Sequence, residues 1–303
     1  MKKYSVLWVM VMGILSFSST AQAQSNADTT YWKKGATAGL TFNQVSLSNW
    51  QAGGENSVSG NINLVAFANY ERSKISWDNN FEFGLGYNRQ GDLQIKTDDR
   101  IFINSVYGYQ VSDRAYLSLS GQFRTQFFEG YKSATDSTLI SNLFAPAYVL
   151  LGSGLDFKVA PGLKVYFSPI TAKLTIVADQ TLADQGAFGV EAATYNDVGE
   201  LLTAGDNSWW QMGSYLTVNY VKANLVKNVD FRTRLELYSN YLRNPQNLDV
   251  NGEIGVLLKV NSWLAANFDV QYIYDDDIRI DDAGPRLQMR QVFGVGLTFK
   301  WSD

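Results

Sequence analysis

Hydrophobic and polar residues alternate along most of this chain. Between residues 75 and 87 the odd positions are apolar or aromatic apart from Asn79, and the even positions are polar or glycine. Successive side chains of a β-strand point to opposite faces, so this alternation predicts a strand with one apolar and one polar face. The same pattern returns at 229–241, 264–274 and 293–301, and it indicates an all-β protein.

The chain divides into about twelve such strands, most of them 12 to 17 residues long. Strands of globular proteins usually have about 5 or 6 residues, whereas a tilted strand needs roughly 9–11 residues to cross a membrane. The lengths therefore favour a transmembrane antiparallel up-and-down β-barrel. We expect its strands near 35–47, 57–71, 75–89, 99–110, 115–128, 144–158, 163–177, 208–224, 229–241, 248–260, 263–274 and 287–301.

Short and long links alternate between these strands. The short links are 72–74, 111–114, 159–162, 226–228 and 261–262, and the long ones are 48–56, 90–98, 129–143, 178–207, 242–247 and 275–286. Outer-membrane barrels have short periplasmic turns and longer extracellular loops. An even number of antiparallel strands then places both termini on the periplasmic side.

The strand at 163–177 interrupts its own alternation. Its apolar face begins on Leu163, Val165 and Phe167 and continues on Ile170, Leu174 and Ile176. The change falls at Ser168-Pro169, where proline lacks the N–H that a strand ladder needs. This predicts a β-bulge, which inserts one extra residue and restores the register.

Alternation alone leaves two environments open for the apolar face. A soluble lipocalin-like barrel or β-sandwich would bury this face in a core, whereas a membrane barrel would present it to lipid. Charges in the middle of the polar rows and aromatic residues at both ends of the apolar rows favour lipid outside and water inside. The last strand also ends on an alternating aromatic row, Phe293 to Trp301, which resembles the signal that barrel-insertion machinery reads.

The first 23 residues have the features of a secretory signal peptide. Lys2 and Lys3 precede an apolar run from Val6 to Phe17, and Ala21-Gln22-Ala23 is a small-x-small cleavage pattern. The apolar run is short for a helix that spans a bilayer, which takes about 20 residues. We therefore expect a signal peptide at 1–23 and a single barrel domain at 24–303, located in the outer membrane of a Gram-negative bacterium.

The composition excludes several kinds of chemistry. The chain has no His and no Cys, which removes Ser-His and Cys-His nucleophiles, disulfides, and imidazole or thiolate metal ligands. Net charge is −4 and no basic tract is present, so nucleic acid is not an expected partner. Outer-membrane lipid, the insertion machinery and a small polar solute are the expected partners, and no cofactor is expected.

Charges of both signs recur at the inward-facing positions. They can pair across the interior and seal it, or they can line a weakly selective pore. Inward glycine pairs such as Gly84/Gly86 and Gly152/Gly154 can keep the bore open or relieve the curvature of the sheet. The charged residues predicted to line the lumen are Glu82, Arg100, Arg124, Lys173, Arg234, Glu236, Glu253 and Asp269.

Two loops carry candidate features. Asp275, Asp276, Asp277, Asp281 and Asp282 offer closely spaced oxygen ligands of the kind that Ca²⁺ uses, although their spacing is not that of an EF-hand. The alternative is a solvated acidic rim. The longest loop, 178–207, is apolar for an exposed segment, so it either folds into the mouth as a constriction or caps the rim.

Six blocks carry a resemblance to a known family. They are NWQAGGEN at 49–56, KTDDR at 96–100, DQTLADQGAFGV at 179–190, NYLRNPQN at 240–247, YDDD at 274–277 and GPRLQ at 284–288. Together they resemble an uncharacterised family of Bacteroidota outer-membrane β-barrel proteins, catalogued as a domain of unknown function. The resemblance implies a location and a fold, and it brings no activity and no catalytic residues.

Three functions are compatible with these observations. The first is a passive or gated conduit for small polar solutes, and the second is a non-conducting barrel that scaffolds an envelope or surface complex through its loops. The third is an enzyme with carboxylate chemistry at the rim. Because outer-membrane hydrolases generally employ a His that this chain lacks, we do not expect an enzyme.

Overall fold

The computed structural model describes residues 31–46, 56–278 and 284–302. It divides into two units, Met1–Tyr31 and Trp32–Asp303, and all elements below belong to the second. The predicted signal peptide at 1–23 and the start of the predicted domain at residue 24 lie outside the described residues.

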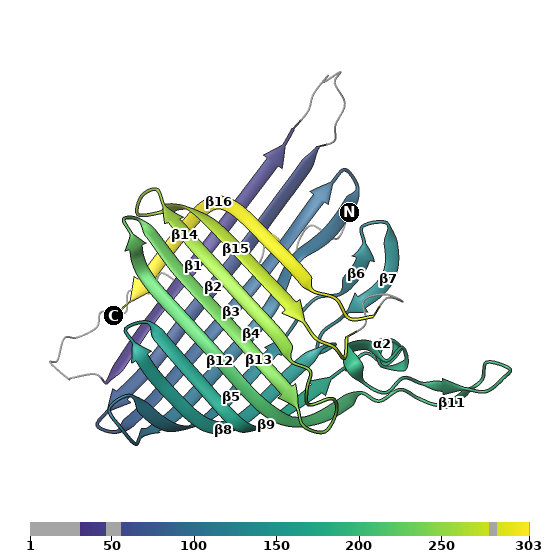
Figure 1. The fold of residues 1–303 in the computed structure, drawn as a ribbon. Helices are drawn as coiled ribbons and strands as arrows, with labels where there is room; N and C mark the ends of the chain where they lie inside the picture. Colours follow the sequence, from purple (N-terminus) through teal and green to yellow (C-terminus); the bar gives the residue numbers. More distant parts are fainter. Residues whose placement is uncertain (1–30, 47–55, 279–283, 303) are drawn as a thin grey trace. The chain divides into compact units, whose positions relative to one another are not determined.

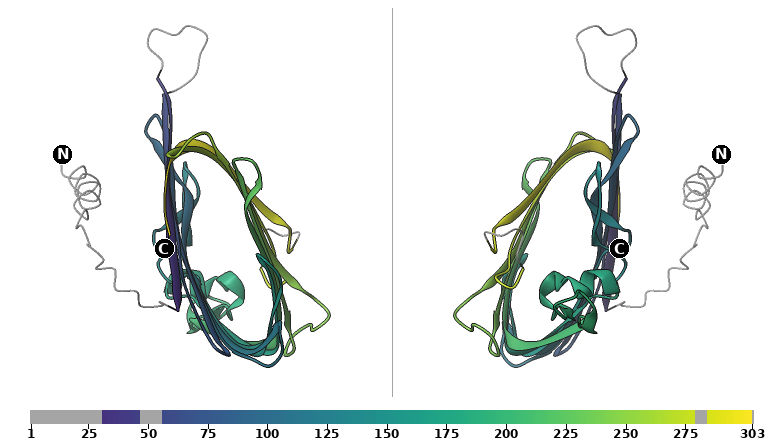
Figure 2. Two further views of the ribbon diagram at one scale, coloured as in Figure 1. Left: turned by 90° about the vertical axis from the view of Figure 1, so that its left-hand side faces the viewer. Right: turned by 90° about the vertical axis from the view of Figure 1, so that its right-hand side faces the viewer.

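Twelve strands form a closed antiparallel barrel, as the alternation predicts. Each strand pairs with the next long strand along the chain, and the last pairs with the first. Viewed along its length, the barrel is a closed and flattened ring (Figure 2). The strands are β1 (Trp32–Val45), β2 (Ser57–Arg72), β3 (Ile75–Gln90), β4 (Leu93–Gln110), β5 (Ala115–Thr125), β8 (Ala147–Ala160), β9 (Leu163–Ile176), β12 (Ser208–Val226), β13 (Val229–Asn240), β14 (Asp249–Lys259), β15 (Leu264–Tyr274) and β16 (Gln288–Ser302).

The two ends of the barrel differ in their links. Tight turns follow β2, β4, β8, β12 and β14 at one end, which we call the turn end. Ser73, Gly162 and Asn228 take positive φ angles in three of these turns, a conformation in which glycine and asparagine are favoured. The other end, the loop end, carries β6 (Gly130–Ser133), β7 (Asp136–Ser141) and the segment between β9 and β12 (Figure 1).

The predicted long link at 90–98 is wrong. Only Gly91 and Asp92 separate β3 from β4, and β4 continues through Thr97 to Arg100. This part of β4 lacks a regular alternation: polar Gln94 and Thr97 are exposed, and so are apolar Leu93 and Ile95, so its sequence resembles a loop. A register shift opposite Gly86 and Tyr87 makes Thr97 the extra residue of a β-bulge.

The bulge predicted in β9 is confirmed. Opposite Gly213 and Tyr215 of β12, the partners in β9 step from Thr171 to Ser168, and the pairing with β8 shifts at the same place. The Ser168 side chain is fully buried, and its hydroxyl lies 2.8 Å from the carbonyl oxygen of Ile170. The Ser168 hydroxyl thus donates a hydrogen bond to a backbone carbonyl at the point where the strand ladder is interrupted.

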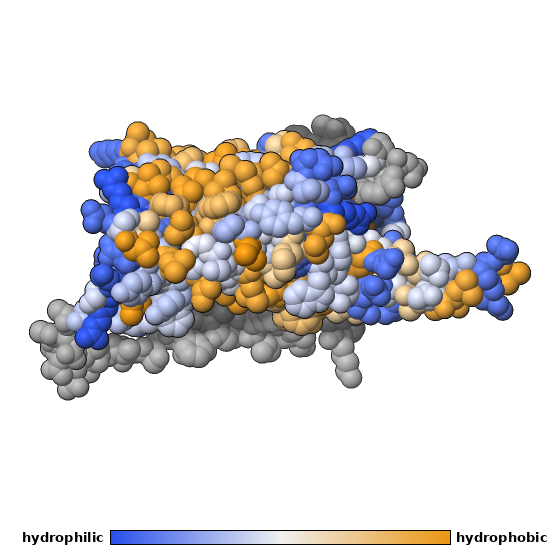
Figure 3. Space-filling view, turned by 60° about the horizontal axis from the view of Figure 1, so that its bottom comes forward, coloured by the Kyte–Doolittle hydropathy of each residue, from blue (hydrophilic) through white to orange (hydrophobic). Residues whose placement is uncertain are grey.

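The apolar face of the barrel is its exposed face. Hydrophobic side chains form a broad band between two hydrophilic ends (Figure 3), and Leu119, Ile170 and Phe293 are all more than 60% exposed. The buried side chains of the same strands are mostly polar, among them Thr171, Gln211 and Glu236. A soluble barrel or β-sandwich buries its apolar face, so this distribution excludes that alternative and is typical of a membrane barrel.

Exposed aromatic side chains mark both borders of the apolar band. Trp77, Tyr109, Trp263 and Trp301 lie near the turn end, and Phe127, Trp210 and Tyr241 lie near the loop end. Aromatic girdles at the two interfaces are a feature of outer-membrane barrels. Among the described residues, no helix is long and apolar enough to cross a membrane.

The barrel closes where β1 meets β16. Seven residue pairs join these strands, from Gly35↔Ser302 to Thr41↔Gly296, whereas sixteen pairs join β2 to β3. Because Trp32 also pairs with Tyr70 near the β2–β3 turn, both described ends of the barrel chain lie at the turn end.

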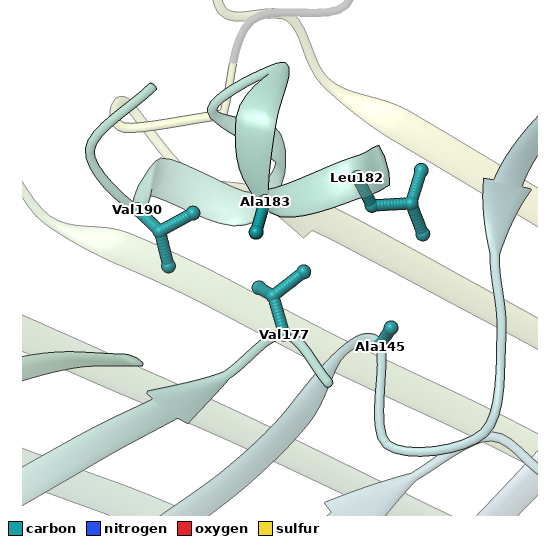
Figure 4. Packing of buried hydrophobic residues seen from close by; sticks show 5 residues of the cluster. All are labelled: Ala145, Val177, Leu182, Ala183 and Val190. Carbon is teal, nitrogen blue, oxygen red and sulfur yellow. The ribbon is translucent and has the colours of Figure 1, made fainter. Parts of the chain in front are cut away.

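The segment between β9 and β12 packs on the rim of the loop end. It contains α2 (Gln180–Asp184), the short helix η1 (Ala187–Gly189), β10 (Thr194–Tyr195) and β11 (Leu201–Thr203). Leu182, Ala183 and Val190 from this segment contact Val177 and Ala145 in a small buried core (Figure 4). The β10–β11 hairpin extends away from the barrel (Figure 1). The segment therefore caps the rim, and its η1 turn reaches the interior at the loop end with Phe188.

Candidate functional site in the barrel interior

A network of ion pairs crosses the middle of the interior. Arg234 of β13 lies at its centre, 2.8 Å from a Glu82 oxygen on β3 and 2.7 Å from a Glu253 oxygen on β14. Glu253 is placed there by strand pairing, since it is the direct partner of Arg234 in the ladder. Glu82 reaches Arg234 from a strand that is not its neighbour, so this contact spans the interior.

Further pairs extend the network from the same inward rows. Arg124 lies 2.8 Å from Glu236, and Arg100 lies 3.4 Å from Glu253. Arg232 lies 3.2 Å from Glu253 and 2.5 Å from Asp269. We call the following eight residues the midsection network: Glu82, Arg100, Arg124, Arg232, Arg234, Glu236, Glu253 and Asp269.

Neutral groups complete the surroundings of these charges. The Tyr215 hydroxyl donates to Glu236 at 2.9 Å, and the Gln122 amide donates to the same carboxylate at 3.0 Å. The guanidinium groups of Arg124 and Arg234 lie 4.9 and 4.3 Å from the centre of the Phe102 ring, within the range of cation–π attraction. Four cations and four anions balance, so the midsection network carries no net charge.

The predicted lumen residues fall into two groups in the structure. Seven of them belong to the midsection network, together with Arg232. The eighth, Lys173, lies apart from it and forms salt bridges with Asp249 at 3.0 Å and Asp275 at 3.7 Å.

A cavity of about 470 Å³ opens between the midsection network and the loop end. We call it the mouth cavity. Phe102, Leu150 and four tyrosines supply much of its wall, while Phe188 of η1 reaches it from the capping segment. Cavities of this size hold small-molecule ligands in other proteins. The tyrosines are Tyr148, Tyr215, Tyr238 and Tyr274.

Four aspartates gather near one side of the mouth cavity, and two of them, Asp249 and Asp275, line it. Carboxylate oxygens of Asp249, Asp275 and Asp276 all lie within 4.8 Å of one another. Asp277 follows them and lies 3.7 Å from Arg243. We call Asp249, Asp275, Asp276 and Asp277 the acidic cluster.

Only part of the predicted Ca²⁺ set is in this cluster. Asp275, Asp276 and Asp277 belong to it, whereas Asp281 and Asp282 lie outside the described residues. Asp249 comes from the start of β14 and was not among the predicted ligands, because no local spacing links it to the loop after β15. Burial and the negative charges of Asp275 and Asp276 raise the pKa of Asp277 above its ordinary value of 3.8.

Two buried polar atoms beside this cluster have no partner in the described part of the chain. They are the hydroxyl of Tyr238, a residue 5% exposed, and the Oε1 atom of Gln211, a residue 2% exposed. The amide nitrogen of the same Gln211 donates to Asp277 at 3.4 Å. Buried polar atoms without a partner are rare in native proteins and call for a specific explanation.

Tyr148, Tyr215 and Tyr238 were not among the predicted lumen residues. A signal was present, because Tyr238 has the same parity as Arg232, Arg234 and Glu236 along β13. Aromatic residues also fill the outward rows, so an aromatic side chain alone does not mark an inward position.

The inward glycines permit close approach between strands. A Cβ atom at Gly154 would overlap the backbone carbonyl of Phe167, and one at Gly84 would meet an Asp98 carboxylate oxygen at 2.7 Å. Space at these positions is already filled by neighbouring atoms. This favours curvature and packing over an open bore as the reason for these glycines.

Residues 42–131 match a family described as "Protein of unknown function (DUF3078)". The match confirms the resemblance to a family of unknown function for the part of the chain from β1 to β6, and it does not show an origin in Bacteroidota. No curated protein matches the sequence at a significant level.

Solved structures similar to this chain are membrane barrels. The translocator domain of the autotransporter NalP from Neisseria meningitidis is 10% identical over 98% of this chain and 97% of its own, with a TM-score of 0.37. An outer membrane channel from Pseudomonas putida F1 is 11% identical over 93% of this chain and 98% of its own, with a TM-score of 0.39. The NanC porin is 10% identical over 88% of this chain and 100% of its own, with a TM-score of 0.36.

Proposed function

We propose that this protein is an outer-membrane β-barrel that serves as a passive or gated conduit for small polar solutes. The observation that carries the proposal is the mouth cavity of about 470 Å³, which lies in a polar interior, inside a closed barrel whose outer face is apolar. A wall of this kind separates a wet lumen from lipid, and a cavity of this size admits a small solute.

The outer surface supports a location in a membrane. A lipid-facing charge costs roughly 2–4 kcal/mol at the middle of a bilayer, and the outward rows of this barrel carry Leu, Ile, Val and Phe there. The proposal includes a signal peptide at 1–23, one domain at 24–303, periplasmic termini and delivery by the barrel-insertion machinery.

The midsection network supports gating. Its side chains are largely buried and reach across the interior between β3, β4, β5, β13 and β14. A solute that moves from the mouth cavity to the turn end has to pass these ion pairs. These ion pairs join side chains only. A change of side-chain conformation, without movement of the backbone, is therefore enough to change the width of the path.

Reconstitution into planar bilayers tests the proposal. The purified barrel should give stable single-channel steps, and a variant with Arg124→Gln and Glu236→Gln should conduct at least about twofold more, because one ion pair of the network loses its attraction while the hydrogen-bonding amides remain. The matched control is Lys259→Gln with Asp230→Asn, which removes a salt bridge of 2.7 Å near the turn end. If the unmodified barrel and the Arg124→Gln, Glu236→Gln variant both fold and neither conducts, the protein is not a conduit.

One observation favours the alternative, a non-conducting barrel that scaffolds a complex. The β10–β11 hairpin extends from the barrel and exposes apolar side chains, with Val198 79% and Leu202 66% exposed. A silent barrel that loses a bound partner on removal of 194–203 would support this alternative. Enzymatic activity is not part of the proposal.

A further inference from the structure

The charge around the mouth cavity is unevenly distributed. The midsection network, on the turn-end side of the cavity, is neutral. Two more lining pairs also balance: Lys96 lies 2.8 Å from Asp99, and Arg290 lies 3.3 Å from Asp98. The acidic cluster differs. Its four carboxylates are accompanied by two cations, Lys173 and Arg243, in the described part of the chain. Asp276 accepts a hydrogen bond from the Asn247 amide and has no cation there, so two negative charges of the cluster lack a balancing cation among the described residues.

The carboxylates that carry this negative charge have little contact with water. The side chain of Asp277 is 9% exposed, and those of Asp249 and Asp275 are 16% and 14% exposed. Charges with restricted access to water interact more strongly than surface charges, since the effective dielectric constant around them is lower. A cation that enters the mouth cavity is therefore attracted to this side of it.

The same side already accommodates an alkylammonium group. The Lys173 ammonium lies between Asp249 and Asp275, 5.0 Å from the centre of the Tyr238 ring and 6.0 Å from that of Tyr148. Carboxylates together with aromatic faces are the surroundings in which proteins bind organic ammonium ligands. Aromatic walls also offer contact to the carbon chain of such a ligand, which a bare metal ion does not need.

The unpartnered hydroxyl of Tyr238 points to a ligand independently of the charges. It is buried, it belongs to a residue that lines the mouth cavity, and no hydrogen-bond partner is found for it in the described residues. A hydroxyl accepts a hydrogen bond from an ammonium N–H as readily as it donates to a polar solute. A bound amine would satisfy it.

We propose that the mouth cavity selects small organic cations, solutes that carry one or two alkylammonium groups, and that the acidic cluster with Tyr238 and Tyr148 is their binding site. This inference rests on the proposed function in one respect, since it takes the mouth cavity to be the solute site of the conduit.

Calorimetric titration of the folded barrel in detergent tests the proposal without requiring conduction. Putrescine, butanediol and succinate have the same four-carbon length and differ in charge, so they isolate the role of charge. Putrescine should bind at least about tenfold more tightly than butanediol, and succinate should not bind. Equal binding of putrescine and butanediol, or preferred binding of succinate, would overturn the proposal.

Variants locate the site. Asp275→Asn should weaken putrescine binding about tenfold, while Asp113→Asn, which makes the same charge change in the exposed β4–β5 turn, should leave it unchanged. Tyr238→Phe removes only the unpartnered hydroxyl, so the variant should fold and bind putrescine about threefold to tenfold more weakly. If neither Asp275→Asn nor Tyr238→Phe alters the affinity, the amine binds elsewhere and the proposal is wrong.

Calcium chloride alone provides the decisive competing arm. Tight Ca²⁺ binding that excludes putrescine and is lost in Asp275→Asn would make the cluster a metal site and overturn the amine proposal. The outcomes for the two proposals remain separable: a silent barrel that binds putrescine refutes the conduit only, and a conducting barrel without preference for putrescine refutes the cation site only.

Discussion

Arg234 shows how a single side chain determines the state of the interior. Three carboxylates, those of Glu82, Glu253 and Glu236, lie within 4.0 Å of its guanidinium group. Arginine suits this position because its planar fork can donate to several carboxylates in fixed directions, which a lysine ammonium does not do. Its removal would leave buried negative charge without compensation.

We therefore expect Arg234→Gln to destabilise the folded barrel by about 3–5 kcal/mol, the usual cost of breaking a buried ion pair from one side. Urea unfolding in the presence of lipid vesicles measures this. Arg89→Gln is the control, because Arg89 is 55% exposed and lies 3.8 Å from an exposed Asp92, and such surface pairs contribute about 1 kcal/mol or less. Equal losses in the two variants would contradict the role assigned to the midsection network.

Asp184 makes the capping segment sensitive to pH. Hydrogen bonds from the Gln180 side chain and the Gly205 N–H lower the pKa of Asp184 below its usual 3.8. A lowered pKa in the folded state means that the charged form stabilises the segment above the unfolded pKa and that this contribution is lost as the pH falls through the folded pKa. The protection of the Gly205 amide against hydrogen exchange should be higher near neutral pH than below about pH 4.

The variant Asp184→Asn separates this effect from general acid unfolding. It should reduce the protection of the Gly205 amide at neutral pH and remove most of its dependence on pH, while amides in the middle of β13 stay protected. A Gly205 amide that keeps its pH dependence in the variant would show that another group is responsible.

At the scale of the element, the bulge in β9 creates a tight contact with β8. Gly154 lies beside the point where the ladder shifts from Ile170 to Phe167, and a side chain there would overlap the Phe167 carbonyl. Gly39 in β1 is a glycine on the same inward side with nothing within 4 Å of an added Cβ. The two positions separate the steric requirement for glycine from its general effect on strand propensity.

Gly154→Ala should cost about 1–3 kcal/mol, because backbone has to move to make room. Gly39→Ala should be neutral or slightly stabilising, since it reduces the entropy of the unfolded chain without a clash. Thermal unfolding of the two variants in the same detergent checks this. A larger loss for Gly39→Ala would contradict the packing explanation.

The strands were predictable from sequence because their two faces meet different solvents. Lipid on one side and polar groups on the other impose strict alternation, and the rows in β3, β13 and β16 can be read directly. The loop at 90–98 was assigned wrongly because the bulge at Thr97 and the exposed polar residues before it interrupt this alternation. The local sequence pattern shows which residues share a face of a strand, but it does not show whether that face meets lipid, water or protein.

The partners within the interior were not predictable. Arg234 and Glu82 are 152 residues apart, and what brings them together is the closure and stagger of the barrel, which no local pattern encodes. Asp249 joins Asp275 and Asp276 for a similar reason, because β14 and β15 are neighbours and their loop ends coincide. The alternation gives the parity of these residues along each strand, whereas their pairing required the register.

At the scale of the whole molecule, the exposed apolar band determines where the barrel is stable. Leu119 in the middle of β5 is 62% exposed. A band of many such exposed apolar side chains is unfavourable in water and favourable in lipid. The polar interior and the aromatic girdles at both ends complete a surface suited to a bilayer.

Leu119→Arg should therefore cost about 2–4 kcal/mol in a lipid bilayer, and Val111→Arg, at the turn end of the band, about 0–1 kcal/mol. Equilibrium unfolding from lipid vesicles measures both, and refolding yield on a gel distinguishes folded from unfolded barrel. Comparable costs at the two positions would argue against a membrane centred on the strands.

The short pairing between β1 and β16 makes the wall uneven around its circumference. Seven residue pairs join β1 to β16, whereas sixteen join β2 to β3. Fewer backbone hydrogen bonds therefore have to break to open the β1–β16 junction than to separate β2 from β3. Thermal breathing should therefore begin there, so that the amides of residues 35–41 and 296–302 exchange with solvent before those of β2 and β3. Unzipping along this line, and not collapse of the whole cylinder, is the expected first step when the barrel comes apart.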